Sequence, residues 1–436
     1  PAAAPAPMPL PAPSQRTSLD ELMRIALANR PESRIAWAKW KIAAASVDAA
    51  RSAYLPTFAL DLLAGVERTQ FPLPASVLPQ GSFNADFAAF RPQLAFEWIL
   101  LDFGRRSAAT DAAMALESAE SLAYQAHCQQ VMLEVSKAYF DLLDLQDDLR
   151  VVEAALEDAT SLEEAASLGL DAGLSSKQDV FEARRYLAEY RFDHSALRGK
   201  IRTASARLAE QAGIDPRHPL VVKNYADIPL PPAIDEPVGQ LVENALSDRP
   251  DLKARMAELR AAEAAVREAE ADFLPSLVAS GNAGPSYDAF RVEGYDWVNA
   301  NEPIYAVGVA LRWPFFDGGR RSALLAEAEA LAEKASAQVE SAKNRTIREV
   351  WSAYTDYRSA REKLESARAW VDAATLSFDS ALTAFRNGTS PITDVTTRQT
   401  GLAKSRAAFS KARNDVFLAL AAVQAATGSL TSPSAR

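Results

Sequence analysis

A strict seven-residue repeat between residues 350 and 385 constrains this chain more than any other feature. Every seventh residue there is bulky and apolar: Val350, Tyr357, Leu364, Val371, Phe378 and Phe385. An alanine stands three residues after each of the first five. A repeat of seven that is kept this long drives left-handed supercoiling against a neighbouring helix, and alanine lets the partner backbone come close. The pattern has no break from about Arg320 to Arg386, which predicts a helix of roughly 67 residues, on the order of 100 Å long.

Composition excludes several classes of protein. The 436 residues carry a formal net charge of −10, with a pI near 5.1, which argues against nucleic acid as a partner. No stretch approaches 18 uninterrupted apolar residues, so the sequence contains no candidate for a transmembrane helix. Cys128 is the only cysteine, which rules out an intramolecular disulfide and any CxxC motif.

The chain also contains a long internal repeat. Tyr54-Leu55-Pro56 returns as Phe273-Leu274-Pro275, and the segment WILLDFGRRSA at 98–108 returns as WPFFDGGRRSA at 313–323. Because Pro, Gly and Trp keep register as well as Ala, chance similarity between two alanine-rich halves does not explain the match. Such self-similarity indicates one supersecondary unit that is used twice.

Two segments in each copy alternate between apolar and polar residues, which is typical of strands with one apolar face. In the first copy, Phe58, Leu60 and Leu62 share one parity, while Asp61 lies on the other. Arg68 falls on the apolar parity and is expected at a rim, because a basic side chain at mid-bilayer on a lipid-facing surface costs roughly 2–4 kcal/mol.

Each copy is therefore predicted as a helix, a two-strand hairpin, a very long helix, a tight turn and a return helix. The predicted organisation, in chain order, is a Pro/Ala-rich tail at 1–17, a first repeat at 18–212 (strands about 56–68 and 90–102, helical hairpin 105–212), a Pro-rich linker at 213–237, a second repeat at 238–428 (strands about 275–284 and 303–316, helical hairpin 320–427) and a tail at 429–436.

The predicted strands are too few to seal a membrane pore within one chain. One chain offers four strands, an open sheet edge is not tolerated in lipid, and the smallest single-chain outer-membrane barrels have eight strands. If these strands span a membrane, three copies would supply 3 × 4 = 12 strands, enough for a barrel with a lumen. The predicted fold class is mainly α with membrane β: a trimer with a 12-stranded β-barrel, continued by a coiled-coil α-barrel.

The chain resembles the TolC-like outer-membrane factors, the outer membrane efflux protein family. The resemblance rests on the two-fold repeat, on YLP and FLP before the hairpins, on DFGRR and DGGRR after them, and on two helix-turn signatures, Ala172-Gly173-Leu174 with Asp179-Val180 and Asn387-Gly388-Thr389 with Asp394-Val395.

The resemblance implies a function and a set of partners. It implies a homotrimer in the outer membrane of a Gram-negative bacterium, with a large periplasmic portion and with the Pro-rich linker in an equatorial belt. The trimer would be the passive exit duct of a tripartite efflux pump or of a type I secretion system. Its partners would be outer-membrane lipid, a periplasmic adaptor (membrane fusion) protein, and an inner-membrane pump or ABC transporter.

The resemblance also implies an aperture at the helix turns. Asp394 matches an acidic residue that lines the constriction in the family, whereas Thr397 stands where some members have a second acidic residue. Three copies of Asp394 on an axis would form a ring that favours cations. The alternative interpretation is a carboxylate in the first turn of a helix, which the helix dipole favours. Asp179 is a further aperture candidate, but its place three residues after Ser176 favours a helix cap.

The turn residues Gly173, Leu174, Gly388 and Thr389 are candidates for docking the adaptor; the alternative is that they simply form tight turns.

Nothing in the sequence indicates catalysis, a metal or a cofactor. The three histidines, His127, His194 and His218, have no metal-ligand spacing, and no nucleophile elbow, Walker loop or dinucleotide fingerprint is present. The rival function is a soluble coiled-coil scaffold, for which the long seams alone would suffice. The alternating segments that end at Trp98 and Trp313 favour the duct, because a scaffold has no use for them.

Overall fold

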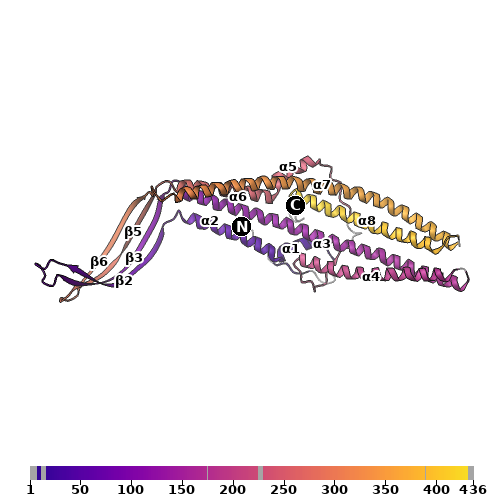
Figure 1. Ribbon diagram of the computed structural model, residues 1–436, viewed down its shortest axis with the longest axis horizontal. Coiled ribbons are helices and arrows are strands. Elements are labelled where there is room, and N and C mark those ends of the chain that lie inside the picture. Colours follow the sequence, from indigo (N-terminus) through magenta and orange to yellow (C-terminus); the bar gives the residue numbers. More distant parts are fainter. Residues whose placement is uncertain (1–6, 11–15, 174, 224–228, 388, 431–436) are drawn as a thin grey trace. The chain divides into compact units, whose positions relative to one another are not determined.

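The computed structural model describes residues 7–10, 16–173, 175–223, 229–387 and 389–430, and Figure 1 labels its helices and strands. In chain order they are β1 (Arg16–Thr17), α1 (Leu19–Asn29), α2 (Pro31–Ser52), β2 (Thr57–Pro72), β3 (Ser82–Leu101), α3 (Arg105–Asp171), α4 (Lys177–Gln211), β4 (Val221–Val222), α5 (Val238–Asp248), α6 (Pro250–Ala271), β5 (Ser276–Val292), β6 (Val298–Arg312), α7 (Arg320–Arg386) and α8 (Ile392–Ala426). Among the described residues, no helix combines the length and apolar character needed to cross a membrane.

The chain forms two compact units, and each takes segments from both sequence repeats. The helical unit comprises Pro1–Trp40, Ala119–Arg255 and Val339–Arg436. The sheet unit comprises Lys41–Ser118 and Met256–Gln338. The long helices α3 and α7 contribute to both units.

The heptad seam of α7 is buried, as the spacing predicts. The helix spans 67 residues, and Val350, Tyr357 and Ala360 on its seam are at most 5% exposed. They pack with apolar residues of α5 and α8, including Leu241 and Val416. Beside Ala353 and Ala360, the space left by the small side chains is occupied by this cluster, which includes Leu241 and Val416.

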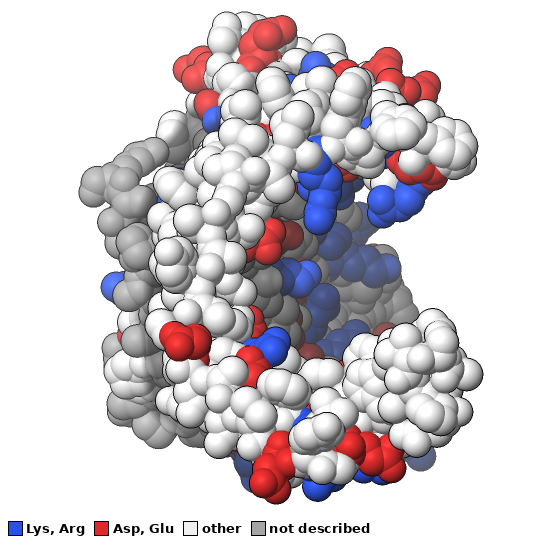
Figure 2. Space-filling model, turned by 90° about the vertical axis from the view of Figure 1, so that its left-hand side faces the viewer, with Lys and Arg blue, Asp and Glu red and all other residues white. Residues whose placement is uncertain are grey.

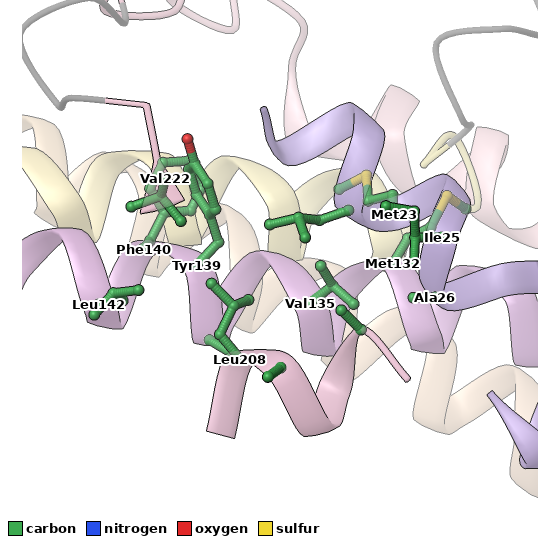
Figure 3. Close-up of a cluster of buried hydrophobic side chains, with 14 of the residues drawn as sticks. Met23, Ile25, Ala26, Met132, Val135, Tyr139, Phe140, Leu142, Leu208 and Val222 are labelled. Carbon is green, nitrogen blue, oxygen red and sulfur yellow. The ribbon is translucent and has the colours of Figure 1, made fainter. Parts of the chain in front are cut away.

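A second apolar core lies where α1 packs on α3. Figure 3 shows Met23 and Ile25 of α1 close to Met132 and Val135 of α3, with Leu208 of α4 on the other side of α3. Val135, Leu208 and Ile25 are at most 1% exposed. This core fixes the short N-terminal helix on the long one, since truncating any of these side chains would leave a cavity in a close-packed interior.

The sheet unit holds one antiparallel sheet in the order β2-β3-β5-β6. Its two halves come from the two repeats, and β3 joins β5 across them. The outer strands β2 and β6 each pair with a single neighbour.

The strands extend further from the helices than the sequence predicts. β3 begins at Ser82 rather than near residue 90, and β5 ends at Val292 rather than near residue 284. The region before residue 90 is rich in Phe and small residues, which suggested a loop, but the ladder continues through it. The β3–β5 register omits the pairs between Phe90–Tyr287 and Leu94–Ala283. In that gap, a Cβ on Gly284 would lie 2.1 Å from the carbonyl oxygen of Pro92, so only glycine allows this approach.

The limits of the outer strands β2 and β6 also differ from the predicted ones. β2 continues to Pro72 rather than about residue 68, and β6 runs from Val298 to Arg312 rather than from about 303 to 316. Pro314 supplies no N–H to a ladder, which accounts for the early end of β6.

The two faces of the sheet differ in chemistry. Phe58 and Leu60 of β2 and Tyr305 and Val307 of β6 are each more than 60% exposed on the apolar parity. The opposite parity carries small and polar residues, and a hollow of about 610 Å³ lies against it. The surface hollow seen in the space-filling view holds charged side chains (Figure 2).

Arg68 is paired at the loop end of the sheet. Its Nε and Nη2 donate to Asp86 at 2.6 and 3.0 Å, and Arg291 donates to the same carboxylate at 2.5 Å. Arg68 lies four residues before the end of β2 at Pro72. The cation on the apolar parity is therefore neutralised by a cross-strand partner.

A clamp built from the DxGRR motif closes each strand-to-helix corner. Asp102 accepts hydrogen bonds from the backbone N–H and from Nε of Arg106, at 3.0 and 2.7 Å. Nη1 of Arg106 also donates to the carbonyl oxygen of Ile99 at 2.8 Å. Ile99 lies two residues before the end of β3. In the second repeat, Asp317 accepts the same two bonds from Arg321 at 3.1 and 2.8 Å. The aspartate caps the long helix and the second arginine holds the strand end to it.

Buried arginines occupy equivalent places in the two repeats. Arg30 donates to Glu134 at 2.8 Å, and Arg249 donates to Glu349 at 2.6 Å. The side chain of Arg249 is 10% exposed and also binds Asp251 at 2.7 Å. Burial alone would raise the pKa of Asp251, but the hydrogen bonds and charge of Arg249 outweigh it and hold that pKa below its usual value.

Two glycines allow these arginines to pack. Gly213 and Gly428, just beyond the return helices α4 and α8, have φ of 67° and 75°. A Cβ would lie 3.0 Å from the backbone nitrogen of Arg30 at Gly213 and 3.1 Å from Cα of Arg249 at Gly428. Each return helix therefore ends against the arginine that lies between the first two helices of its own repeat.

Removing the Arg249 side chain should destabilise the helical unit. Arg249→Ala removes the buried cation that Asp251 and Glu349 share and leaves them only the longer contacts with Arg345, at 3.5 and 3.7 Å. We expect a loss of about 2 kcal/mol in the free energy of unfolding. Arg358→Ala is the control, because Arg358 pairs with Glu362 in a solvent-exposed i,i+4 contact worth roughly 0.3–0.5 kcal/mol. Thermal unfolding of the detergent-solubilised protein measures both, and equal small shifts would contradict a structural role for Arg249.

An acidic group on α3 lies in an unfavourable environment. Burial raises the pKa of Asp144 to about 6, Asp148 and Asp415 act in the same direction, and Lys411 opposes them. Oδ1 of Asp144 is buried and accepts no hydrogen bond from the described residues. The carboxylate therefore costs stability whenever it is ionised.

Asp144→Asn should stabilise the protein at neutral pH and not at acid pH. Between about pH 4 and 6 the folded chain retains a proton that the unfolded chain releases, so this residue makes stability fall as pH rises through that window. The neutral amide removes that fall, with a gain on the order of 1–2 kcal/mol at pH 8. Melting temperatures at pH 4 and pH 8 measure the effect. The exposed Asp372→Asn is the control, and a gain of equal size at both pH values would contradict the ionisation argument.

Candidate functional site

The two helix turns that the sequence singles out join α3 to α4 and α7 to α8. In the first, Gly173 has φ of 71° and donates its N–H to Leu170 at 3.1 Å, while Ser175 donates to Gly169 at 3.1 Å. A Cβ on Gly173 would meet no atom within 4 Å, so the outside of this turn is open. These bonds satisfy the last carbonyl groups of α3 without help from another element.

The second turn uses a threonine. Thr389 donates both its backbone N–H and its Oγ1 to the carbonyl oxygen of Ala384, at 3.0 and 2.9 Å. Thr389 is exposed. The candidates Leu174 and Gly388 lie outside the described residues.

The structure brings the first residues of α4 and α8 together. Val180 and Val395, which follow Asp179 and Asp394 in the two repeats, are 4% and 1% exposed. Both belong to one apolar cluster with Ile392 of α8 and with residues near the end of α3. The two turns therefore form one packed end of the helical unit, held by equivalent valines.

Asp179 forms the predicted helix cap. Its Oδ2 accepts the backbone N–H and the Oγ of Ser176, at 2.9 and 2.6 Å, and Oγ of Ser176 accepts the backbone N–H of Asp179 at 3.2 Å. This reciprocal capping box satisfies donors at the start of α4. The carboxylate is thus engaged in local structure.

Asp394 is held differently. Pro391 precedes α8 and provides no capping side chain, and among the described side chains Asp394 accepts one hydrogen bond, from Oγ of Ser390 at 2.6 Å. Asp394 and Thr397 are exposed and stand three residues apart, on one face of the helix. Oγ1 of Thr397 donates to the carbonyl oxygen of Thr393 at 2.7 Å. Asp394 therefore presents a carboxylate to solvent on the first turn of α8.

Behind these residues lies a cavity of about 190 Å³, lined by Asp158, Phe378, Leu382, Val395 and Gln399 among others. Burial raises the pKa of Asp158, while the neighbouring amide of Gln399 and the charge of Arg406 oppose the rise. The turn end of the unit thus combines an apolar cluster with a partly buried carboxylate.

Sequence reasoning missed two sets of contacts near the strand ends. Nε1 of Trp98 donates to the carbonyl oxygen of Tyr54 at 2.9 Å, and Nε1 of Trp313 donates to that of Phe273 at 3.1 Å. The guanidinium carbon of Arg106 lies 4.8 Å from the ring centroid of Tyr54. The matched spacing of these residues in the two repeats is the signal that could have shown them.

Among the described residues, no three His, Cys, Asp or Glu side chains gather closely enough to hold a metal ion.

Comparison with known proteins identifies the family. The sequence model of the outer membrane efflux protein family matches residues 22–213 and again residues 241–429. Protein CyaE of Bordetella pertussis is 30% identical over 354 residues, which cover 80% of this chain and 70% of CyaE. Outer membrane protein TolC of Vibrio cholerae is 27% identical over 421 residues, which cover 95% of this chain and 91% of TolC.

A solved structure shows the same fold. The crystal structure of the outer membrane protein VceC from Vibrio cholerae matches with a TM-score of 0.74 and 22% identity, covering 94% of this chain and 96% of VceC. The resemblance in the DxGRR and helix-turn motifs is therefore confirmed over nearly the whole chain, and the fold combines an α-barrel with a β-barrel. The chain belongs to the outer membrane efflux protein family, whose members are outer-membrane channels of Gram-negative bacteria used in efflux and secretion.

Proposed function

We propose that three copies of this chain form the exit duct of a tripartite efflux pump or a type I secretion system. The duct conducts substrates passively from the periplasm or from an inner-membrane pump to the outside. Its strands make a 12-stranded barrel in the outer membrane, and its helices continue as a periplasmic α-barrel.

The observation that carries the proposal is the pair of single-partner strands β2 and β6 at the edges of the sheet. Each unsatisfied backbone group in the hydrocarbon region costs several kcal/mol, so these edges must be paired in a membrane. Pairing β6 of one copy with β2 of the next satisfies both, and 3 × 4 = 12 strands close a barrel wide enough for a lumen.

The chemistry of the two faces supports the same arrangement. The exposed apolar parity, which includes Leu60 and Val307, suits contact with lipid. The opposite parity, with Asp61 and Glu97 among small residues around the hollow, suits a water-filled channel. A soluble coiled-coil scaffold would not account for this exposed apolar face.

The exposed turns supply the docking surface in this proposal. Gly173 and Thr389 lie on tight turns whose backbone groups are bonded internally, so a periplasmic adaptor meets a preformed surface. The proposal extends to Leu174 and Gly388, which stand next to these residues in the sequence. The adaptor links the duct to an inner-membrane pump or ABC transporter, which selects the substrate and supplies the energy.

Three copies of Asp394 line the aperture in this proposal, with Thr397 one helical turn further on. The exposed carboxylate of Asp394 supports this role, whereas the capping box of Asp179 supports a structural one. Opening follows from a change in packing between the helix pairs, because packed helices have discrete alternative arrangements.

Extraction and mass measurement test the assembly. The protein should leave the membrane fraction only with detergent and then migrate as a trimer, of 3 × 47.1 = 141.3 kDa, by light scattering corrected for bound detergent. In planar bilayers the trimer should conduct ions without an energy source. A soluble elongated monomer would exclude the duct.

Removing the aperture carboxylate should change ion selectivity. Asp394→Ala should reduce the preference for cations, because the ring of three negative charges is lost. Reversal potentials of single channels in a salt gradient measure this, and unchanged selectivity would remove Asp394 from the pore.

Asp179→Ala serves as the matched control at the equivalent turn. It removes the capping box, so we expect a loss of about 0.5–2 kcal/mol in stability with selectivity unchanged. A change in selectivity as large as that of Asp394→Ala would place Asp179 in the aperture as well.

A further inference from the structure

The two hairpins of the sheet pair their strands in the same register. The segment that leads into β2 recurs 219 positions later before β5, and the segment at the end of β3 recurs 215 positions later at the end of β6. In the first hairpin Thr57 lies opposite Glu97. Adding the two offsets places Ser276 (57 + 219) opposite Arg312 (97 + 215), which is the pair observed in the second hairpin. The repeat in sequence is therefore also a repeat in strand pairing.

The contact between the two hairpins predicts the contact between two copies of the chain. Within the chain β3 lies against β5, and Glu97 lies opposite Ser280. In the same register, β6 of one copy would place Arg312 (97 + 215) opposite Asp61 (280 − 219) of β2 in the next copy. In one chain β2 and β6 are separated by β3 and β5, so they stand roughly 14 Å apart. Asp61 and Arg312 therefore meet only at this copy junction, where β6 of one copy lies against β2 of the next.

The copy junction brings opposite charges together. Asp61 and Arg312 are exposed and lie on the polar parity of their strands. Opposite charges in directly opposite positions stabilise an antiparallel pair of strands. The sheet itself shows that such a pair closes: Asp86 lies opposite Arg291 across β3 and β5, and Nη2 of Arg291 donates to that carboxylate at 2.5 Å. An arginine and an aspartate in opposite positions of this sheet are thus within hydrogen-bonding distance.

The charges at this level of the sheet differ between the two repeats. Glu97 of β3 is acidic and faces the neutral Ser280 within the chain, whereas its counterpart Arg312 on the open edge is basic. Asp61 is the acidic counterpart of Ser280 on the other open edge. A glutamate at position 312 would bring two anions together at the copy junction, which destabilises an antiparallel pair. A partner strand from outside the chain accounts for this exchange of charge.

The same register gives an occupant to an open space beside β2. Gly65 is the counterpart of Gly284 (65 + 219), where a Cβ would lie 2.1 Å from the carbonyl oxygen of Pro92. A Cβ on Gly65 would meet no atom of the described residues within 4 Å. At the copy junction, Gly308 lies opposite Gly65 and Val307, the counterpart of Pro92 (92 + 215), lies beside it. A close approach of strands explains the glycine in both repeats, within the chain at one and between copies at the other.

We propose that Asp61 of one copy and Arg312 of the next form an ion pair that fixes the register in which two copies join. The occupant of each open edge is a second copy of this chain, because the offsets of the repeat, the opposite charges and the space at Gly65 all indicate one register. A slip by two residues keeps the apolar parity on its face but places Arg312 opposite Ala59 or Leu63, and the ion pair is lost. The inference rests on the proposed trimer and adds the contact by which its copies select their register.

Disulfide trapping tests the register. In a Cys128→Ser background, which removes the only cysteine, Asp61→Cys and Arg312→Cys are combined and the membrane fraction is oxidised. Directly opposite strand positions hold Cα atoms about 4.5–5.5 Å apart, which a disulfide can span. We expect covalent dimers and trimers on non-reducing gels. Thr57→Cys with Arg312→Cys is the matched control and should give none, because four residues along β2 add roughly 13 Å.

Charge exchange tests the ion pair itself. Asp61→Arg alone places two cations at the copy junction, and Arg312→Asp alone places two anions, so each should lower the temperature at which the trimer dissociates in detergent. The combined exchange restores the pair with its signs reversed and should recover at least half of the larger loss. Glu97→Arg with Arg312→Asp is the control and should recover nothing, because Glu97 faces Thr57 and Ser280 within its own chain.

The outcomes separate the ion pair from the duct. Covalent oligomers through positions 61 and 312, together with recovery in the combined exchange, support the ion pair. A conducting trimer that is linked through positions 57 and 312, or that shows no recovery, would overturn the ion pair and leave the duct standing. A covalent product with a different protein would give the open edge another occupant and overturn the inference. A parent protein that is monomeric in detergent would overturn both the ion pair and the duct.

Discussion

The constraint on which this structure depends is that backbone groups in a membrane must all be hydrogen-bonded. The sheet of β2, β3, β5 and β6 satisfies its interior strands and leaves two edges with single partners. A soluble protein could leave those edges in water or cover them with charged residues. Here one face of the sheet is apolar and exposed, so it suits contact with lipid rather than with water. Because these two edges need partners from outside the described sheet, the four strands of one chain do not close a pore by themselves.

The same closure problem explains the use of one unit twice. The buried pairs of Arg30 with Glu134 and Arg249 with Glu349 are repeated, and so are the corner clamps of Arg106 and Arg321. The arginine–glutamate pairs join segments about 100 residues apart, whereas the clamps join residues four apart, and all are charge-assisted hydrogen bonds. A barrel built from repeated units needs the same strand-to-helix angle at every corner, and the clamps of Arg106 and Arg321 hold that corner locally.

Much of the fold could be predicted from residue patterns, and the misses have physical causes. The seam around Tyr357 gave the helix limits because a seven-residue period is unambiguous over many turns. The outer parts of β3 and β5 were missed because they lie beyond Pro92 and Gly284, where the pairing of the two strands has a gap, and only the ladder shows that the strands continue past it. In the turn region, Asp179 and Asp394 match in sequence, yet Ser176 completes a capping box for the first whereas Pro391 offers no side chain to the second. That difference depends on the residue at the cap rather than on the aspartates.

Differences between the two repeats carry more information about surfaces than their similarities do. The clamp aspartate and arginine are shared, but Phe103 replaces the left-handed glycine found at Gly318. Arg105 pairs with Asp272 at 2.9 Å, tying the first corner to the end of α6, while the position equivalent to Asp272 in the first repeat is Ala53. This contact thus joins the two repeats within a chain, and the alanine at position 53 cannot form its equivalent at the other corner. A duplicated unit keeps what sets the backbone and varies what meets a neighbour. We therefore expect the residues that break the repeat to lie on the surfaces by which this chain meets its surroundings.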